Sequence, residues 1–152
     1  MITIEEVLDF QKSWSDGIII IGNLYKDNEN YHKIAINFID KNYAYDCTDV
    51  LFKPTLAADK PFRLDKISAL SYFIGENADY PEDSGFAIKG WDNIRWENIG
   101  VNINDDSAIC MGHYFFRKKD DHELMVEFSL VLRKFDGILK IILHDSHLPY
   151  IK

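Results

Sequence analysis

The sequence predicts an α+β fold in which helices come first and an antiparallel sheet follows. Up to about residue 75, apolar residues recur with the three-four spacing of helices that bury one face. After residue 84 the pattern changes to β-favouring runs that are separated by short turns. The runs cover residues 85–103, 107–118, 122–134 and 138–147. This order is typical of a fold in which the helices cover one concave face of the sheet.

A capping box opens the first helix. Thr3 is followed three residues later by Glu6, and side chains at this spacing accept hydrogen bonds from each other's backbone N–H groups. Gly17 and Gly22 interrupt the helix, which predicts close packing against a neighbouring element. Polar residues 26–30 end it. Its predicted buried stripe consists of Ile4, Val7, Gln11, Trp14, Ile18, Ile21 and Tyr25.

Two shorter helices and one strand complete the first half. Residues 31–39 repeat the helical spacing, and an asparagine just before them can cap this second helix. Residues 50–52 predict a strand that Pro54 closes, because proline lacks the N–H donor of a strand interior. A third helix begins after Asp65 and stops at Gly75. Its apolar positions are Ile67, Leu70 and Ile74.

Three places shape the predicted sheet. Residues 90–93, Gly-Trp-Asp-Asn, favour a corner that splits the first run in two and makes a five-strand meander. Near Asn98 the odd and even positions exchange apolar character, which indicates a β-bulge or strong bend. Asp136 and Gly137 predict a type I′ turn, so residues 138–147 should pair with the run before them.

Composition excludes several classes of protein. The net charge is −8 and the 17 Lys and Arg residues are scattered, so we expect no nucleic-acid partner. The longest aliphatic run near the N-terminus, residues 18–21, is far shorter than the roughly 20 residues of a spanning helix, so no membrane partner is expected. Two cysteines and no signal peptide suit the cytoplasm. We expect one soluble domain over residues 1–152.

The last predicted strand ends in four consecutive polar residues. Five of the six residues 138–143 are aliphatic, and His144, Asp145, Ser146 and His147 follow. Side chains two apart on a strand share a face, so His144 pairs with Ser146 and Asp145 with His147 on the opposite face. One metal ion could be shared by the two histidines only if the strand broke between them. We therefore predict no metal site.

Several segments resemble a known family over nearly the whole chain. They are Trp14, Gly17, residues 49–57 (Asp-Val-Leu-Phe-Lys-Pro-Thr-Leu-Ala), Phe62-Arg63, residues 71–75, residues 82–88, Trp91, Glu97-Asn98, Met111-Gly112, Tyr114 and residues 143–150. Together they resemble the nuclear-transport-factor-two-like superfamily, in a branch near the calcium/calmodulin-dependent kinase association domain. This branch includes the metal-free iota-class carbonic anhydrases. The resemblance implies a cone-shaped, cystatin-like fold with N-terminal helices packed on a strongly bent antiparallel sheet.

This resemblance implies a metal-independent, carbonic anhydrase-like lyase that hydrates carbon dioxide and uses no cofactor. It implies a bicarbonate pocket formed by Thr55, Tyr72, His144 and Ser146. His144 would be the general base, and the hydroxyl groups would donate to the developing carboxylate oxygens. The family motif in the terminal strand is His-His-Ser-Ser, from which this chain departs at Asp145 and at residue 147. If the functional pair is His144 with Ser146, it survives here.

The residues alone leave other hypotheses open. His144 can be a core histidine bonded to Tyr72 or to backbone, and Lys53 and Arg63 can attract an anion or be ordinary ion-paired residues. The chain can also be a non-catalytic association domain, or a small-molecule binder or isomerase with Glu97 as its base. Aromatic strands predict a homodimer or higher homo-oligomer through the sheet face. These aromatic residues are Trp91, Trp96, Tyr114, Phe115, Phe116 and Phe128.

Overall fold

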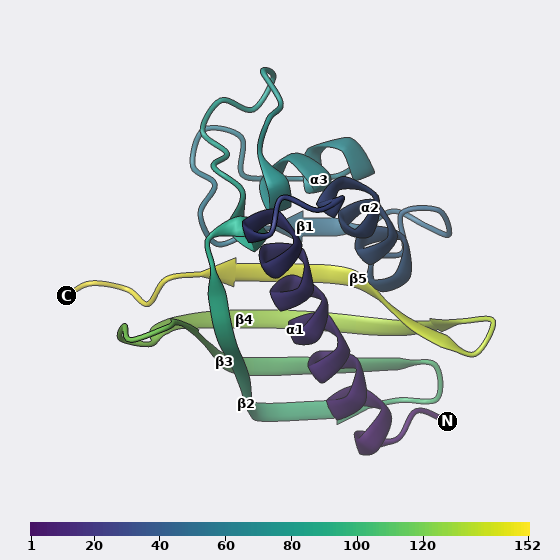
Figure 1. Ribbon diagram of the computed structural model, residues 1–152. Coiled ribbons are helices and arrows are strands. Elements are labelled where there is room, and N and C mark those ends of the chain that lie inside the picture. The colour runs from purple at the N-terminus through teal and green to yellow at the C-terminus, as the bar shows by residue number, and fades with distance from the viewer.

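Three helices cover one face of a five-stranded mixed sheet (Figure 1). The structure is a computed structural model and describes residues 1–152. The elements are α1 (Ile4–Lys26), α2 (Tyr31–Asn42), β1 (Leu51–Lys53), α3 (Lys66–Ile74), the short 3-10 helix η1 (Phe86–Ile88), β2 (Trp91–Ile103), β3 (Ser107–Lys118), β4 (Leu124–Phe135) and β5 (Ile138–His147). Their order across the sheet is β1-β5-β4-β3-β2. The predicted α+β class is confirmed.

The helices begin and end where their capping residues indicate. Thr3 and Glu6 form the predicted capping box of α1, and Asn30 and Asp65 accept N–H groups at the starts of α2 and α3. The close packing predicted at Gly17 is present, since a Cβ there would lie 2.6 Å from the Phe38 ring. None of the helices is long and apolar enough to cross a membrane.

The predicted buried faces of two helices need correction. Ile67 of α3 is 70% exposed, whereas Tyr72 is buried. The small and aromatic residues of α3 therefore face the core, and the apolar Ile67 faces outward. The buried residues of this helix are Ser68, Ala69, Ser71, Tyr72, Phe73 and Ile74. Ile4 and Tyr25, at the two ends of the α1 stripe, are also exposed. Both lie at the ends of α1, and the ring of Tyr25 contacts that of Tyr31 at the start of α2.

The sheet contains four meander strands rather than the predicted five. Residues 86–88 form η1 instead of a strand, because Gly85 and Gly90 take positive φ angles of 88° and 90° that turn the chain on either side. The bulge expected near Asn98 is confirmed by a register shift between Asn98 and Gly100, and Figure 1 shows β2 bending in its middle. Asp136 and Gly137, with φ angles of 50° and 80°, make the predicted tight turn.

The fifth strand, β1, pairs parallel with β5 and makes the sheet mixed where the sequence predicted an antiparallel one. Phe52 lies beside His144, and Lys53 lies beside Asp145. Parallel neighbours need a long crossover connection and leave no turn signal in the sequence. The consequence for the site is direct: the loop that follows β1 is brought to the polar end of β5.

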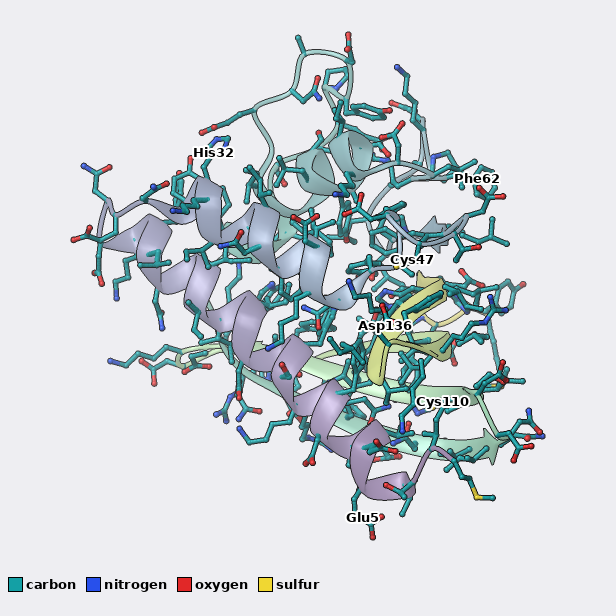
Figure 2. The ribbon with its side chains drawn as sticks, turned by 90° about the vertical axis from the view of Figure 1, so that its right-hand side faces the viewer. Glu5, His32, Cys47, Phe62, Cys110 and Asp136 are labelled. Carbon is teal, nitrogen blue, oxygen red and sulfur yellow. The ribbon has the colours of Figure 1, made fainter.

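The core lies between the helices and the sheet as one cluster of 29 buried apolar residues. Figure 2 shows these two layers from the side. The aromatic residues Trp96, Tyr114 and Phe128 of the strands pack on one another and, through Trp96 and Tyr114, on Trp14 of α1. They fill the core and do not form the outer face that was predicted to be the interface.

Candidate functional site

His144 lies at the centre of the buried polar residues. It projects from β5 toward the helices and is only 2% exposed. Its Nδ1 is 3.0 Å from the hydroxyl of Tyr43, and its Nε2 is 3.0 Å from the hydroxyl of Tyr114. The imidazole also stacks on Phe52 of the neighbouring strand, with 5.1 Å between ring centroids. Burial lowers the pKa of His144 to about 3, so the imidazole is neutral at pH 7.

A cluster of hydroxyl groups adjoins this histidine. Ser146 Oγ lies 2.5 Å from Thr55 Oγ1 and 2.5 Å from the hydroxyl of Tyr114. The hydroxyl of Tyr72 accepts a hydrogen bond from the backbone N–H of Leu56, at 3.2 Å. The structure therefore brings together all four predicted site residues, Thr55, Tyr72, His144 and Ser146, because each lines the same small cavity.

The cavity is narrow and its walls carry no ionised group. The space open to the centre of a water molecule is about 10 Å³, near the minimum that holds one water. Burial raises the pKa of Tyr72 and that of Tyr114 well above the ordinary value for tyrosine, so both hydroxyls stay protonated. The site offers neutral hydrogen-bond donors to a small anion. It contains no strong base, since the pKa of His144 is far below 7.

A buried ion pair connects the two loops that lie beside the site. Arg63 is fully buried and donates to both carboxylate oxygens of Asp83, at 2.7 and 2.8 Å. Next to it, Glu82 accepts hydrogen bonds from the backbone N–H groups of residues 58–60. These contacts join the loop after β1 to the loop after α3. Of the two hypotheses for Arg63, the structure supports the ion-paired one.

Lys53 and Glu97 lie outside the cavity. Lys53 projects beside Asp145, on the other face of the sheet, and its Nζ is 3.5 Å from the carbonyl oxygen of Ser146. The Glu97 side chain is 50% exposed and lies beside His113. Neither residue lines the space that His144 and Ser146 share.

The two pairs of the terminal motif lie on opposite faces, as strand alternation predicts. His144 and Ser146 are buried, whereas the side chains of Asp145 and His147 are 44% and 48% exposed. His147 Nε2 is 3.4 Å from a carboxylate oxygen of Glu127 on β4, and its Nδ1 is 3.8 Å from Asp145. No group of three or more His, Cys, Asp or Glu side chains is arranged to hold a metal ion.

Sequence reasoning missed both partners of His144. The alternative hypothesis of a core histidine named Tyr72 or backbone as the partner, and that choice is wrong, because Tyr43 and Tyr114 contact the two ring nitrogens. Tyr114 shares its face of β3 with buried Cys110 and Phe116, a signal that alternation could have provided. Tyr43 follows the end of α2 and has no motif. Only the packing of α2 against β5 brings it to the site.

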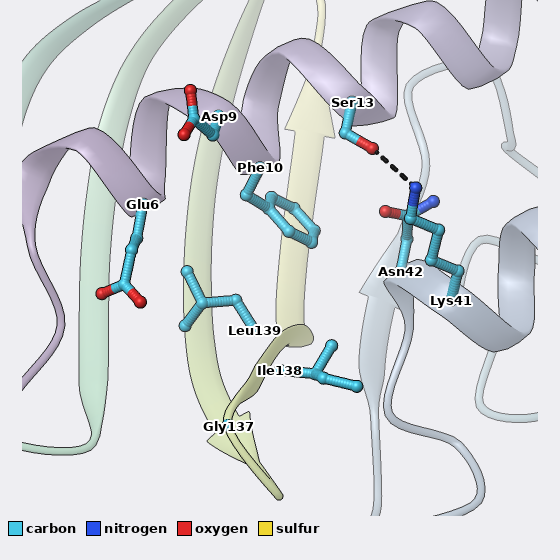
Figure 3. Close-up of a pocket in the computed structure, with 9 residues that line it drawn as sticks. All are labelled: Glu6, Asp9, Phe10, Ser13, Lys41, Asn42, Gly137, Ile138 and Leu139. Atoms are coloured by element: carbon cyan, nitrogen blue, oxygen red, sulfur yellow. Dashed lines mark hydrogen bonds between the residues drawn. The ribbon is translucent and has the colours of Figure 1, made fainter.

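A larger hollow of about 270 Å³ lies elsewhere, between α1, the end of α2 and the β4–β5 turn (Figure 3). Phe10 and Leu139 project into it between the polar groups of Glu6 and Asp9 and those of Lys41. Lys41 Nζ donates to Ser13 Oγ at 3.0 Å. This hollow shares no lining residue with the cavity at His144.

Solved structures of distant proteins share this fold. A putative calcium/calmodulin-dependent protein kinase II association domain from Xanthomonas campestris covers 98% of this chain and 89% of its own, with a TM-score of 0.59 and 21% identity. A protein of Shewanella oneidensis that is similar to nuclear transport factor two covers 94% and 97%, with a TM-score of 0.52 and 12% identity. At these identities the likeness shows the fold alone, and it confirms the predicted cone architecture.

Two further relatives are much more similar. The metal-independent carbonic anhydrase of Nostoc sp. is 37% identical over 98% of this chain and 75% of its own length. The structure of an iota-carbonic anhydrase from a cyanobacterium, complexed with bicarbonate, has a TM-score of 0.95 and 35% identity, and covers 99% of this chain and 94% of its own. A family model for metal-independent carbonic anhydrases matches residues 5–148. The chain therefore belongs to the metal-independent carbonic anhydrase family.

Proposed function

We propose that this protein catalyses the reversible hydration of carbon dioxide to bicarbonate in the cavity beside His144. The observation that carries the proposal is the convergence of the hydroxyls of Thr55, Tyr72 and Ser146 on one small, uncharged cavity. The bicarbonate complex of the similar iota-carbonic anhydrase supports the same kind of ligand. Bicarbonate is accordingly the small anion that we expect to bind. Because the open space is near the minimum for one water molecule, we expect the cavity walls to move apart when it binds.

In this proposal the site acts through hydrogen bonds to the developing anion. When water attacks the carbon atom, it gives up a proton and the two oxygens of carbon dioxide gain negative charge. Neutral hydroxyls in a water-poor cavity stabilise that charge strongly because little solvent competes with them. A histidine with a pKa of about 3 is a weak proton acceptor at pH 7. We therefore propose that His144 orients the hydroxyl groups. The proton that the attacking water gives up is taken by the solvent.

Stopped-flow measurement of carbon dioxide hydration by chelator-treated protein tests this function. We expect activity above background in the wild-type protein and a loss of about 10²-fold in Thr55→Val, since an anion donor is removed. Thr48→Val is the matched control, because Thr48 is an exposed hydroxyl outside the cavity, and its activity should stay within about twofold of wild type. Wild-type activity at background, or full activity in Thr55→Val, would overturn the proposal.

We also propose that two copies associate through the outer face of the sheet. One row of paired residues crosses four strands there in the order Glu97, His113, Glu127 and His147. A two-fold axis that runs along the strands between β3 and β4 reverses this row, so each glutamate meets a histidine of the other copy. Exposed apolar side chains surround the row: Ile99, Ile109, Met111 and Met125. A self-complementary row of this kind fits a homodimer.

Light scattering at micromolar concentration tests the association. We expect the mass of a dimer for the wild-type protein, and a shift toward monomer in Glu127→Lys, which places a lysine opposite a histidine. Glu29→Lys reverses an exposed charge on the helix side and should leave the mass unchanged. A monomeric wild-type protein would contradict the proposal. A dimer with background hydration would favour the association-domain hypothesis over the enzyme.

The two thiols bear on where the protein acts. Cys47 is exposed and Cys110 is buried, and neither forms a disulfide; Figure 2 labels both. Unpaired cysteines suit a reducing compartment, so we keep the cytoplasm as the proposed location. Fractionation of cells that express the full-length protein tests this, and recovery from an oxidising compartment would contradict it.

A further inference from the structure

A continuous chain of hydrogen bonds runs from α1 through the site to the loop after β1. It starts at the indole of Trp14, whose Nε1 is 3.2 Å from the hydroxyl of Tyr43. It continues through both ring nitrogens of His144, at 3.0 Å each, to Tyr114. From there it passes through Ser146 to Thr55 in two steps of 2.5 Å. Trp14, Tyr43 and Tyr114 are each at most 2% exposed.

The first member of the chain decides its direction. An indole N–H can only donate, so Tyr43 must accept from Trp14. The hydroxyl of Tyr43 has one hydrogen, and its only other hydrogen-bond partner is Nδ1 of His144. If Nδ1 carried a hydrogen as well, the hydrogen of Tyr43 would be buried without an acceptor, which folded proteins avoid. Tyr43 therefore donates to Nδ1.

Every later hydrogen follows from this choice. Burial keeps the imidazole neutral, and a neutral imidazole that accepts at Nδ1 carries its hydrogen on Nε2. Nε2 then donates a hydrogen bond to the hydroxyl of Tyr114. That hydroxyl has one hydrogen, which it donates in a hydrogen bond to Ser146. In the same way Ser146 donates to Thr55. The hydrogen of Thr55 is then directed away from Ser146, toward the cavity and the hydroxyl of Tyr72 beside it.

We infer that Trp14 is a positioning residue, which sets the tautomer of His144 and thereby turns the hydroxyl of Thr55 into a donor for an anion in the cavity. The inference rests on the proposed function, since bicarbonate is the anion that would receive this bond. Tyr72 belongs to the same donor group, because its oxygen accepts from the N–H of Leu56 and its hydroxyl lies beside that of Thr55, so one hydrogen of this pair faces the anion. Without the indole N–H, the hydrogen bonds of the chain can point in either direction, and the hydroxyl of Thr55 is no longer fixed as a donor to the anion.

The test replaces Trp14 by its benzothiophene analogue, in which sulfur takes the place of the N–H and the ring shape is kept. Two-bond ¹H–¹⁵N NMR spectra report which ring nitrogen of His144 carries the hydrogen; a His144→Gln spectrum identifies the signal among the five histidines. We expect hydrogen on Nε2 alone in the wild-type protein and a mixture of tautomers in the analogue. KM for bicarbonate should rise about threefold to tenfold, the loss of one hydrogen bond.

Two variants keep the result interpretable. Tyr43→Phe removes the donor to Nδ1 and should also mix the tautomers. The same analogue at Trp91 should leave the tautomer of His144 and the KM unchanged, because the indole of Trp91 donates to the carbonyl of Phe86, which is outside the hydrogen-bond chain that contains His144. Hydrogen on Nδ1 in the wild-type protein, an unchanged tautomer in the Trp14 analogue, or an equal change at Trp91 would overturn the inference.

The tautomer measurement does not depend on activity, so the two proposals can fail separately. If carbon dioxide hydration is at background while the Trp14 analogue mixes the tautomers, the proposed function fails and the direction of the chain stands. If hydration is well above background while the tautomer is unchanged, the inference about Trp14 fails and the function stands.

Discussion

His144 and His147 stand three residues apart on β5 and have opposite surroundings. His144 is 2% exposed, lies between two tyrosine hydroxyls and is kept neutral by burial. The side chain of His147 is 48% exposed and lies between the carboxylates of Glu127 and Asp145. The same side chain thus belongs to a closed network of neutral groups on one face and to an open charged row on the other.

The difference between the two faces shows that neither change in the terminal motif lies in the proposed site. Strand alternation places Asp145 and His147, the two departures from the family motif, on the outer face. The inner pair His144 and Ser146 is kept together with its partner Thr55. The face that the helices cover therefore holds the proposed site, and both differences from the motif that the resemblance implies lie on the open face.

The largest expected effect separates the two faces by activity. Ser146→Ala removes the hydroxyl that joins Tyr114 to Thr55. Thr55 then loses its fixed orientation as donor, and kcat/KM for hydration should fall by up to about 10²-fold, the loss expected for Thr55→Val and about 2.7 kcal/mol. Ser129→Ala removes a hydroxyl from the outer face, beside Asp145, and should change the rate by less than about twofold. Stopped-flow assays measure both. Similar losses in the two variants would remove the functional distinction between the faces.

The second prediction concerns stability at low pH. The pKa of His144 falls from 6.5 in the unfolded chain to about 3 in the folded protein. Between pH 6.5 and pH 3 only the unfolded chain takes up the proton. The free energy of unfolding therefore falls by about 1.4 kcal/mol for each unit that the pH is lowered, and at about pH 4.5 it is about 3 kcal/mol below its value at about pH 6.5. Above pH 6.5 this group has no effect. Urea unfolding at several pH values measures the change.

A matched pair of variants isolates the contribution of His144. In His144→Gln this part of the pH dependence should disappear, while His147→Gln should keep the wild-type dependence. Carboxylates that contact neither histidine contribute equally to all three proteins and cancel in the comparison. Glu127 and Asp145 lie beside His147, and as exposed partners they change stability by no more than about 0.5 kcal/mol. If His144→Gln and the wild-type protein lose stability in parallel, His144 is not buried in a neutral form.

The smallest effect is expected on the outer face. His147→Gln breaks contacts of 3.4 and 3.8 Å to two carboxylates that are themselves about 40% exposed. Such exposed pairs contribute little, so the free energy of unfolding at pH 7 should change by no more than about 0.5 kcal/mol. Hydration activity should not change. A large loss of either in His147→Gln would show that the outer face contributes to the site.

Local signals in the sequence predicted the elements well. The capping residues Thr3 and Asp65 mark helix starts, the Asp136-Gly137 turn marks the last hairpin, and the exchange of apolar positions near Asn98 marks the bulge. Each is a property of a few neighbouring residues. Residues 85–90 were assigned to a strand because their composition favours one, but two glycines with positive φ turn the chain there.

Some of the site was equally local. Strand alternation alone placed His144 with Ser146 and away from Asp145 and His147, and the family resemblance pointed to Thr55 and Tyr72. Tyr43 could not be found in this way, because its hydroxyl reaches His144 across 101 positions of the chain. The role of Arg63 likewise depends on Asp83, which lies 20 positions further along the chain and contacts it only in the folded protein.

The sequence by itself determined the helices, the hairpin and the two faces of β5, because those depend on capping, turn chemistry and the period of a strand. Only the tertiary structure decided what lies on the inner face. Parallel pairing of β1 with β5 brings Thr55 to Ser146, and the packing of α1 and α2 brings Trp14 and Tyr43 to His144. Such contacts join residues that are distant along the chain, so no local pattern specifies them.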